Sequence, residues 1–508
     1  MGFVARSFCF VFLVGFVLIS VQCGSGSGSG PIITPPAARC DSGTSPSQAL
    51  ASAPAIAPLL KLSADTFTNA SSQHATEVEP ASFAWGQTIV VAFQVARIFG
   101  GGGADIGYAI SNDSGATWQS GMLPGLTTFE CSGTNSAVSD TAVIYDAAHD
   151  VWLILSLPIS ASSTQVVVNR STDGGATWIH PVVIANGPDL DKDWITCDNT
   201  STSSFYGNCY AEWDDNGNGN QVFMSTTSDG GLTWSSPKSV AANGLGGVPL
   251  VQPDGKVIVP YLANAPFIES FSSADGGATW SSPVVVAQVN DHPVAGGLRS
   301  DALPSATMDA AGNIYVTWQD CSFRTGCSSN DLVISTSADG TTWSAPARIP
   351  IDATTSTVDH FIPGLGIDPT TSGATSHLGL TYYYYPQSNC TASTCALYIG
   401  FISSIDGGAT WSSPTPFAGP MQLSWLPSTF SGQMVADYIA TSFANGKAYG
   451  FFAVAKANSG STFDEAIYTT QSGFDLLAAQ GHFSSAGEGP LNQVVGAQAR
   501  TTTLKKIR

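Results

Sequence analysis

Six copies of almost the same segment recur along the chain, each with an aspartate, at least one glycine and a tryptophan. They read SNDSGATW at 111, STDGGATW at 171, TSDGGLTW at 227, SADGGATW at 273, SADGTTW at 337 and SIDGGATW at 404. The aspartates of successive copies are separated by the length of a supersecondary unit. The chain is therefore expected to fold as a series of similar units that cover one another.

Each unit is predicted to be a meander of four antiparallel strands. After residue 301, alternating apolar residues and turn signals predict strands over 304–309, 313–319, 331–337 and 345–349. The same pattern fits 77–118, 137–185, 193–240, 247–288 and 360–417, and more loosely 434–470. We predict an all-β fold, a β-propeller of four-stranded antiparallel blades, because radial closure protects sheet edges. Seven blades are favoured, with six as the alternative if the last unit is incomplete.

The repeated segment is predicted to be a structural clasp. In S-x-D-x-G-x-T-W the glycine supplies a positive φ, the aspartate accepts hydrogen bonds from turn amides, and the tryptophan buries a large ring. Six of the 12 tryptophans of the chain lie in these copies. We expect each copy to be a self-contained turn with no direct role in binding.

The charge balance excludes one class of partner. The net charge is −20 and only 17 residues are Lys or Arg, so nucleic-acid binding through phosphate contacts is not expected. An acidic surface keeps an exported protein soluble, and cation binding is the alternative. We predict a monomer without a required cofactor, with structural calcium as the alternative. The acidic segment at 212–221 lacks the closing glutamate of an EF-hand.

The N-terminus predicts export. Residues 1–22 contain Arg6 and then an apolar run, as in a secretory signal, and Cys23 follows directly. This order resembles a bacterial lipoprotein signal with Cys23 lipidated, and simple secretion is the alternative. We predict a Gly/Ser/Ala/Pro-rich tether over 24–70, the propeller over 71–485 and a flexible tail over 486–508. The protein is expected outside the cell or in its envelope, with no membrane contact besides this anchor.

The cysteines beyond the signal are even in number and predict disulfides in an exported chain. Short spacings favour Cys197–Cys209, Cys321–Cys327 and Cys390–Cys395, and Cys40–Cys131 follows by elimination. Zinc is the alternative, but the chain has no CxxC pair and no pair of histidines at ligand spacing. No metal site is predicted.

The six copies resemble the Asp-box, or BNR, repeat of the sialidase (neuraminidase) superfamily, over about residues 77–411. The resemblance implies a propeller with all Asp-box turns on one face. It leaves the reaction open, because Asp-boxes also occur in other glycosidases, in polysaccharide lyases and in receptors without activity. The arginine-isoleucine-proline signature of the family is absent, since Arg97 is followed by Ile98 and Phe99.

The resemblance also implies where a site would lie. It is expected on the face opposite the Asp-boxes, at the start of each first strand and in the loop after each second strand. The charged or titratable residues predicted on that face are Glu77, Glu79, Arg97, Asp140, Asp191, Asp193, Arg299, Asp301, Asp320, Arg324, His360, Asp437 and Tyr438.

Roles follow from the chemistry of a sialidase-like site. It needs three arginines for a substrate carboxylate, for which Arg97, Arg299 and Arg324 are the candidates, with Asp301 and His360 as further binding residues. It also needs a nucleophile and an acid. Tyr438 is the candidate nucleophile, with Asp437, Glu77 or Glu79 as its activator, and Asp140 or Asp193 is the candidate acid. The alternative for Tyr438 and Asp193 is a structural role.

Three functions remain open. The first is an exported glycan-active enzyme of sialidase-like type, an exo-acting glycoside hydrolase resembling an exo-alpha-sialidase. The second is a non-catalytic propeller that binds a glycan, a polysaccharide or a protein at the cell surface. The third is a polysaccharide lyase, for which His360, His74 and the tyrosine run Tyr382 to Tyr385 offer a Tyr/His pair.

Overall fold

The computed structural model describes residues 58–130 and 132–476. The predicted signal, the lipidation site at Cys23, the Cys40–Cys131 pair and the tail 486–508 lie outside the described residues. Within the described ranges every named strand pairing is antiparallel, and the helical elements are short 3₁₀ turns, Asn216–Asn218, Ala295–Gly297, Gly373–Thr375 and Leu423–Trp425. Among these residues no helix is long and apolar enough to cross a membrane.

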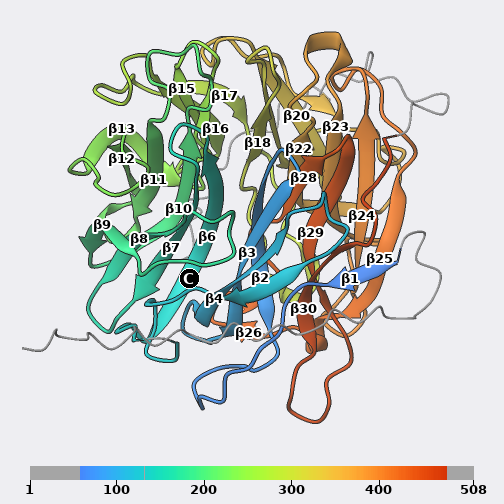
Figure 1. Ribbon diagram of the computed structural model, residues 1–508. Helices are drawn as coiled ribbons and strands as arrows, with labels where there is room; N and C mark the ends of the chain where they lie inside the picture. The colour runs from blue at the N-terminus through green and yellow to red at the C-terminus, as the bar shows by residue number, and fades with distance from the viewer. Residues whose placement is uncertain (1–57, 131, 477–508) are drawn as a thin grey trace, which may run out of the picture. The chain divides into compact units, whose positions relative to one another are not determined.

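Antiparallel pairing arranges the strands in four-stranded sets that follow chain order, and short pairings between neighbouring sets join four of them into two eight-stranded sheets (Figure 1). The first three sets are β2 (Glu77–Trp85), β3 (Thr88–Arg97), β4 (Gly103–Ser111) and β5 (Gln119–Met122); β6 (Ala137–Asp146), β7 (Val151–Ile159), β8 (Thr164–Ser171) and β9 (Val182–Gly187); and β10 (Leu190–Cys197), β11 (Cys209–Asp215), β12 (Gln221–Thr227) and β13 (Lys238–Leu245).

The next three sets follow the same order. They are β14 (Leu250–Val251), β15 (Val257–Ala263), β16 (Phe267–Ser273) and β17 (Val284–Gln288); β18 (Ser305–Met308), β19 (Ile314–Asp320), β20 (Asp331–Ser337) and β21 (Ala347–Arg348); and β22 (Asp359–Ile367), β23 (Leu378–Tyr385), β24 (Ala396–Ser404) and β25 (Thr415–Gln422). The strands of the unit after residue 301 thus lie where the sequence predicts them.

The last set closes the ring with a strand from the start of the described chain. It contains β28 (Ala440–Ala444), β29 (Lys447–Ala455) and β30 (Glu465–Thr470), and β1 (Leu59–Lys61) pairs with β30 as its fourth strand. In Figure 1 the blue β1 lies beside the red β30. The sequence pattern placed residues 59–61 in the tether, because a three-residue strand carries no readable alternation.

The first strands of the sets line the centre of the fold. Contacts run from β2 to β6, β10, β14, β18, β22 and β28 in turn, and β28 contacts β2 again. Apolar side chains fill the space between neighbouring sets, as where Val90 and Ile106 pack with Trp152 and Ile154. The predicted all-β propeller is confirmed, and the choice between seven and six blades stays a prediction. A separate hairpin, β26 (Ser428–Thr429) with β27 (Gly432–Gln433), precedes the last set.

Each Asp-box forms the turn after the third strand of a set, and its aspartate fastens it as predicted. In the first copy Asp113 accepts hydrogen bonds from Thr117 N at 2.8 Å and Thr117 Oγ1 at 2.6 Å. The same bonds recur at Asp275, where the hydroxyl and amide of Thr279 lower the pKa of the carboxyl to about 2. The carboxylates are therefore ionised clasps of their turns.

Several Asp-box turns are not self-contained, because a side chain from the preceding set also donates a hydrogen bond to each of them. Tyr449 Oη on β29 donates to Ser114 O in the first copy at 2.7 Å. Arg170 Nε donates to Gly230 O at 2.5 Å, and Lys238 Nζ donates to Gly277 O at 3.0 Å. The expectation of a self-contained turn is therefore corrected. The motif fastens one blade to the next as well as closing its own turn.

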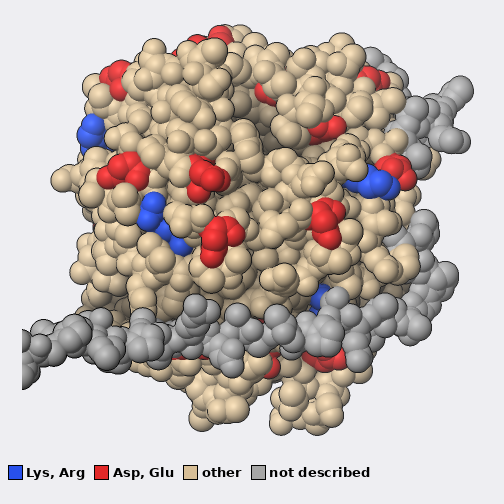
Figure 2. Space-filling view, in the orientation of Figure 1, with Lys and Arg blue, Asp and Glu red and all other residues tan. Residues whose placement is uncertain are grey.

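Disulfides and surface charge agree with the sequence. The predicted pairs Cys197–Cys209, Cys321–Cys327 and Cys390–Cys395 are all formed, which fits an exported protein. Figure 2 shows acidic side chains scattered over one face among few Lys and Arg, with no continuous basic patch on that face.

Candidate functional site

Four first strands carry a bulge near their N-terminal ends, and in three of them, β2, β6 and β10, a charged residue lies inside it; in β22 the residue is Ile362. The pairing of β2, β6 and β10 with their neighbours shifts register there. Inside each of these three bulges one non-glycine residue has a positive φ, namely Glu79 at 56°, Asp140 at 42° and Lys192 at 48°. A bulge turns a side chain away from the regular alternation of a strand and is frequent beside functional sites. Here it brings three charged side chains from three sets together at the centre.

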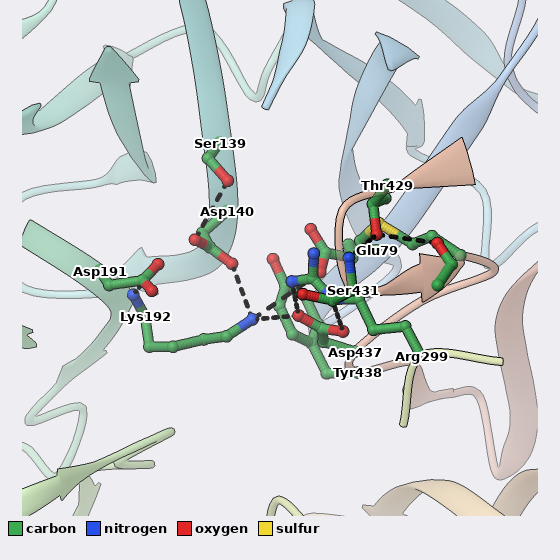
Figure 3. A network of polar contacts seen from close by, with 12 residues as sticks. Glu79, Ser139, Asp140, Asp191, Lys192, Arg299, Thr429, Ser431, Asp437 and Tyr438 are labelled. Atoms are coloured by element: carbon green, nitrogen blue, oxygen red, sulfur yellow. Dashed lines mark hydrogen bonds and ion pairs between the residues drawn. The ribbon is translucent and has the colours of Figure 1, made fainter. Parts of the chain in front are cut away.

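These residues form the central charge cluster with Arg299 and Asp437 (Figure 3). Lys192 Nζ lies 2.7 Å from Asp437 Oδ2, 3.3 Å from Asp140 Oδ1 and 3.8 Å from Glu79 Oε1. Arg299 binds the same Asp437 carboxylate with two donors, Nε to Oδ1 at 2.8 Å and Nη2 to Oδ2. None of the five residues is more than 4% exposed. The cluster is therefore a buried network in which cations and carboxylates neutralise each other.

Burial and pairing set the protonation states of this cluster. Burial alone would raise the pKa of the Asp437 carboxyl, but Arg299 and Lys192 bring it well below its usual range. Burial would lower the pKa of Lys192, but Asp140, Asp437 and Glu79 raise it above its usual value. Burial raises the pKa of Glu79 to about 8, although Lys192 opposes this. At neutral pH, Asp437 is thus ionised and Lys192 charged, while Glu79 is mostly protonated.

Arg97 lies beside the cluster, under the β26–β27 hairpin. Its Nε donates to Met434 Sδ at 3.0 Å and its Nη1 donates to Gly102 O at 2.5 Å. Burial and the nearby Arg299 lower its pKa to about 10. Arg299 N donates to Gln433 O at 2.8 Å, so the same segment also covers Arg299. Two of the three predicted arginines are therefore close together, both covered from solvent.

A cavity of about 420 Å³ runs along the first strands and ends at the cluster. Lys192, Asp193, Asp437 and Tyr438 line this end. The most exposed lining residues, including Trp85, lie at the C-terminal ends of the first strands and in the turns that follow. The cavity therefore reaches solvent on the face of the first-to-second-strand turns, which is also the Asp-box face. The predicted site residues lie near the starts of the first strands, but the route to them comes from the opposite face.

Asp193 is the least satisfied acid of the cavity wall. It is 2% exposed, and neither of its carboxyl oxygens has a hydrogen-bond partner among the described residues. Burial, followed by the nearby Asp140 and Glu212, raises its pKa well above the usual range. Burial has the same effect on Asp191, Glu212 and Asp214 of β10 and β11. Asp193 is thus a neutral acid whose proton faces a cavity.

Tyr438 lines the same end of the cavity as Asp193 and Lys192. Its phenol oxygen accepts a hydrogen bond from Thr141 N at 2.8 Å, and its ring meets the Trp194 ring edge-to-face with centroids 5.5 Å apart. Lys192 Nζ lies 5.3 Å from the ring centroid. Burial, with the nearby Glu79 and Asp140, raises the phenol pKa well above its usual range. The hydroxyl therefore stays protonated unless a base accepts its proton.

Arg324 and His360 lie in another cluster. Arg324 Nη2 contacts Asp331 at 2.5 Å and Asp352 at 2.6 Å, and Arg348 contacts the same two carboxylates. His360 is 1% exposed, its Nδ1 lies 3.3 Å from Asn330 O, and burial lowers its pKa. The structure thus does not bring Arg324 to Arg97 and Arg299, because two aspartates hold it elsewhere.

Three further predicted residues, Glu77, Asp301 and His74, also lie apart from the cavity lining. Glu77 accepts a hydrogen bond from Ser63 Oγ at 2.7 Å, and burial raises its pKa to about 7. Asp301 is half-buried and precedes β18. His74 binds Asp65 Oδ2 at 2.9 Å and Asn69 O at 2.8 Å. None of the three is among the residues that line the described cavity.

Among the described residues, two groups of side chains have the spacing of metal ligands, but neither suits a cation. Asp146, Cys197 and Cys209 form one group, yet both cysteines are joined in a disulfide. Asp331, Asp352 and His360 form the other, yet Arg324 and Arg348 already neutralise both carboxylates. A calcium ion would have to displace two guanidinium groups, so the predicted alternative of structural calcium finds no support in these two groups.

Sequence reasoning missed Lys192, the cation at the centre of the cluster. It stands between Asp191 and Asp193, and regular alternation would place it on the opposite face of β10 from both. The bulge breaks that alternation. The one available signal was the DKD triplet itself, since three consecutive charges are unusual in a strand that a propeller buries.

Comparison with known proteins agrees with the repeat pattern. Residues 160–364 match the family model described as a BNR repeat-like domain. The predicted BNR-repeat resemblance is confirmed. The comparison with curated proteins finds no match.

The comparison with solved structures gives matches at low identity and with TM-scores below 0.5. The Hadza microbial sialidase Hz136 is 14% identical, with 78% of this chain and 66% of that chain covered and a TM-score of 0.41. The polysaccharide lyase PL25 ulvan lyase is 10% identical, with 82% and 96% covered and a TM-score of 0.47. The intramolecular trans-sialidase of Ruminococcus gnavus is 13% identical, with 80% and 96% covered and a TM-score of 0.39. At these values none of their activities transfers to this chain.

Proposed function

We propose that this protein is an exported, glycan-active enzyme, an exo-acting glycoside hydrolase that works outside the cell or in its envelope. The observation that carries this proposal is a pair of carboxyl groups in one cavity with opposite protonation states. Asp193 is neutral because it is buried without a partner, and Asp437 is ionised because Arg299 and Lys192 hold it. Environments that push two carboxyl pKa values apart are the pattern of glycosidase acid and base pairs.

The residues then take the following parts. Asp193 donates its proton to the glycosidic oxygen as the bond to the anomeric carbon breaks, and Asp437 stabilises the positive charge that develops there. Tyr438 is the proposed nucleophile, and a carboxylate must take its proton during attack because burial raises the phenol pKa. Water then attacks the anomeric carbon and gives a proton to Asp193, while the carboxylate returns its proton to the departing Tyr438 oxygen. The net reaction adds one water molecule across one glycosidic bond.

Exo-alpha-sialidase activity is the narrower form of this proposal. It needs three arginines around a substrate carboxylate. The contacts favour it less, because Arg324 binds Asp331 and Asp352, while the fork of Arg299 binds Asp437. A fluorogenic sialoside therefore belongs in the substrate panel as the substrate that this narrower form requires.

The test is a screen of the purified protein against fluorogenic glycosides, followed by Asp193→Asn. The amide cannot donate an acidic proton, so kcat should fall about 10²- to 10⁴-fold on substrates with a poor leaving group. Asp254→Asn makes the same chemical change on an exposed turn residue and should leave kcat unchanged. Full activity of the Asp193→Asn variant would remove Asp193 from the mechanism. Tyr438→Phe, with the exposed Tyr206→Phe as its control, tests the nucleophile in the same way.

A non-catalytic glycan-binding propeller is the second candidate. The specific observation in its favour is that Lys192, Arg299 and Asp437 satisfy one another, as in a buried structural network. In that case neutral and acidic glycosides would remain intact while one of them binds. A polysaccharide lyase is less favoured, because His360 is buried beside Tyr382 and Tyr384, away from the cavity lining.

A further inference from the structure

The charges around the cavity are already paired within the chain. Lys192 is the one cation among the lining residues of the described cavity, and it lies within 3.8 Å of Asp437, Asp140 and Glu79. No arginine lines this cavity in the described part of the chain. Arg299 stands behind Asp437, whose carboxylate takes the two donors that would otherwise bind a ligand carboxylate. The polar end of the cavity thus offers an incoming anion no unpaired cation.

An acidic sugar would find no unpaired cation for its carboxylate at this end of the described cavity. A ligand carboxylate beside the ionised Asp437 would lose its hydration without gaining an unpaired cation, because Lys192 and Arg299 already bind Asp437. It could reach Arg299 only by displacing Asp437, which would then be buried without a partner. Breaking a buried ion pair in this way is strongly unfavourable, because it leaves a charge buried without a partner. Both routes therefore disfavour binding of a sugar that carries a carboxylate.

An uncharged sugar meets a different surface. The walls of the cavity include the aromatic side chains of Phe83, Trp85 and Trp194, on which a sugar ring can stack. Asp193 presents a buried carboxyl group with both oxygens unpartnered, which can donate to and accept from sugar hydroxyls. The cavity volume of about 420 Å³ accommodates a small ligand.

We propose that this cavity binds an uncharged sugar residue and rejects sugars that carry a carboxylate, namely sialic acids and uronates. This inference rests on the proposed function only for the class of ligand, since Asp437 excludes an acid whether or not the bound sugar is then hydrolysed. The sugar enters from the Asp-box face, where the lining residues are exposed, and reaches Asp193 at the inner end of the cavity.

The test uses ligands that differ only in the charged group. Binding of the full chain is measured by calorimetry with 4-nitrophenyl glucosides and glucuronides, and with the galactosides and galacturonides, in both anomers. A fluorogenic sialoside completes the panel. The neutral member of at least one pair should bind at least about tenfold more tightly than its acidic partner. The inference would be overturned if any uronide bound as tightly as its neutral partner, or if the sialoside bound as tightly as the best neutral ligand. Failure of every neutral ligand to bind would also overturn it.

Hydrolysis is followed in the same samples by release of 4-nitrophenol. Binding of neutral glycosides without release of 4-nitrophenol would end the proposed hydrolase function and leave the present inference standing. Release of 4-nitrophenol from a uronide would overturn the present inference and support the hydrolase function. Asp437→Asn removes the carboxylate charge and frees the donors of Arg299. It should therefore reduce the difference in affinity between the neutral and the acidic member of each pair. The exposed Asp254→Asn is the control. If Asp437→Asn does not fold, the comparison of matched ligands on the unmodified chain still decides.

Discussion

Asp437 is the residue on which the charge balance of the centre depends, because it pairs with both Lys192 and Arg299. Asp437→Ala leaves these two buried cations with fewer partners, and we expect it to lower the free energy of unfolding by about 3–5 kcal/mol. Lys447→Ala breaks the exposed ion pair with Asp475, whose atoms lie 3.0 Å apart, and should cost less than about 1 kcal/mol. Urea unfolding of both variants measures the contrast. Equal losses would mean that water reaches the cluster and screens it.

Glu77 gives a second prediction at this scale, through pH. Burial raises its folded pKa to about 7, above the 4.5 of an unperturbed glutamate, so the folded chain holds the proton more tightly than the unfolded chain. The stability from this group is complete below pH 4.5 and is lost as the pH rises through 7, by about 3 kcal/mol at most. Glu77→Gln keeps an oxygen acceptor for Ser63 and removes the titration.

The Glu77→Gln variant should therefore lose less stability than the unmodified chain between pH 5 and pH 8. Urea midpoints at these two pH values, for both proteins, give the comparison. Asp254→Asn serves as the control, because its exposed side chain adds no buried titration. If the Glu77→Gln variant kept the pH dependence of the original chain, water would have to hydrate Glu77 in the folded protein.

At the scale of the element, the Asp-box turn links neighbouring blades. Gly115 has φ of 84°, and a Cβ atom there would lie 2.6 Å from the Tyr449 ring on β29. Gly446 has φ of 72° with nothing within 4 Å of the same position. Both Gly→Ala variants incur the cost of a positive φ, about 1–2 kcal/mol. Only Gly115→Ala also overpacks the contact with Tyr449, which should add about 1–3 kcal/mol.

Thermal midpoints of the two glycine variants measure this difference. Tyr449→Phe provides a further check, since it removes the hydrogen bond to Ser114 O and leaves the ring in place. Gly115→Ala should be the less stable of the two alanine variants. If both variants melt together, the turn closes its own blade only, as the sequence pattern alone would indicate.

The bulges show why the candidate site was only partly predictable. Glu79, Asp140 and Asp437 could be selected because charged residues at strand starts stand out in an apolar chain. Lys192 could not, because strand alternation is the rule by which a sequence is read, and the bulge in β10 breaks it. The partners of Arg324 were also unreadable, since Asp352 lies 28 residues away, beyond the end of β21. Local patterns predict residue types at the centre, whereas long-range pairs decide which of them meet.

For the whole molecule, the sequence predicted the architecture and most strands. The repeat period and the Asp-box turns specify antiparallel meanders, and three disulfides follow from short cysteine spacings. The strand that completes the last set and closes the ring was not predicted. It is Leu59–Lys61, which pairs with β30 near the other end of the described chain, and three residues are too few for a period to show.

The closing strand gives the prediction at this scale. β1 pairs Leu59 with Thr470, Leu60 with Thr469 and Lys61 with Tyr468, and Gln471 N donates to Pro58 O at 2.9 Å. A chain that begins at Leu62 lacks this strand and leaves the edge of β30 unpaired, whereas a chain that begins at Pro58 keeps it. Loss of the strand should lower the thermal midpoint and remove hydrogen-exchange protection in β30 first, because the ring then opens at a free edge.

The comparison of these two chains separates closure from local stability. The backbone amides of β11, in the third set, should keep their protection from hydrogen exchange in both chains. This is expected under conditions where the amides of β30 in the shorter chain exchange. Addition of a peptide with the sequence of residues 57–63 should restore part of the protection in β30, since an extended peptide can add to a free sheet edge. Equal midpoints and equal exchange would show that the packing between first strands holds the ring closed without β1. The contacts between β28 and β2 would then be sufficient to keep the ring closed, and β1 would not be needed for closure.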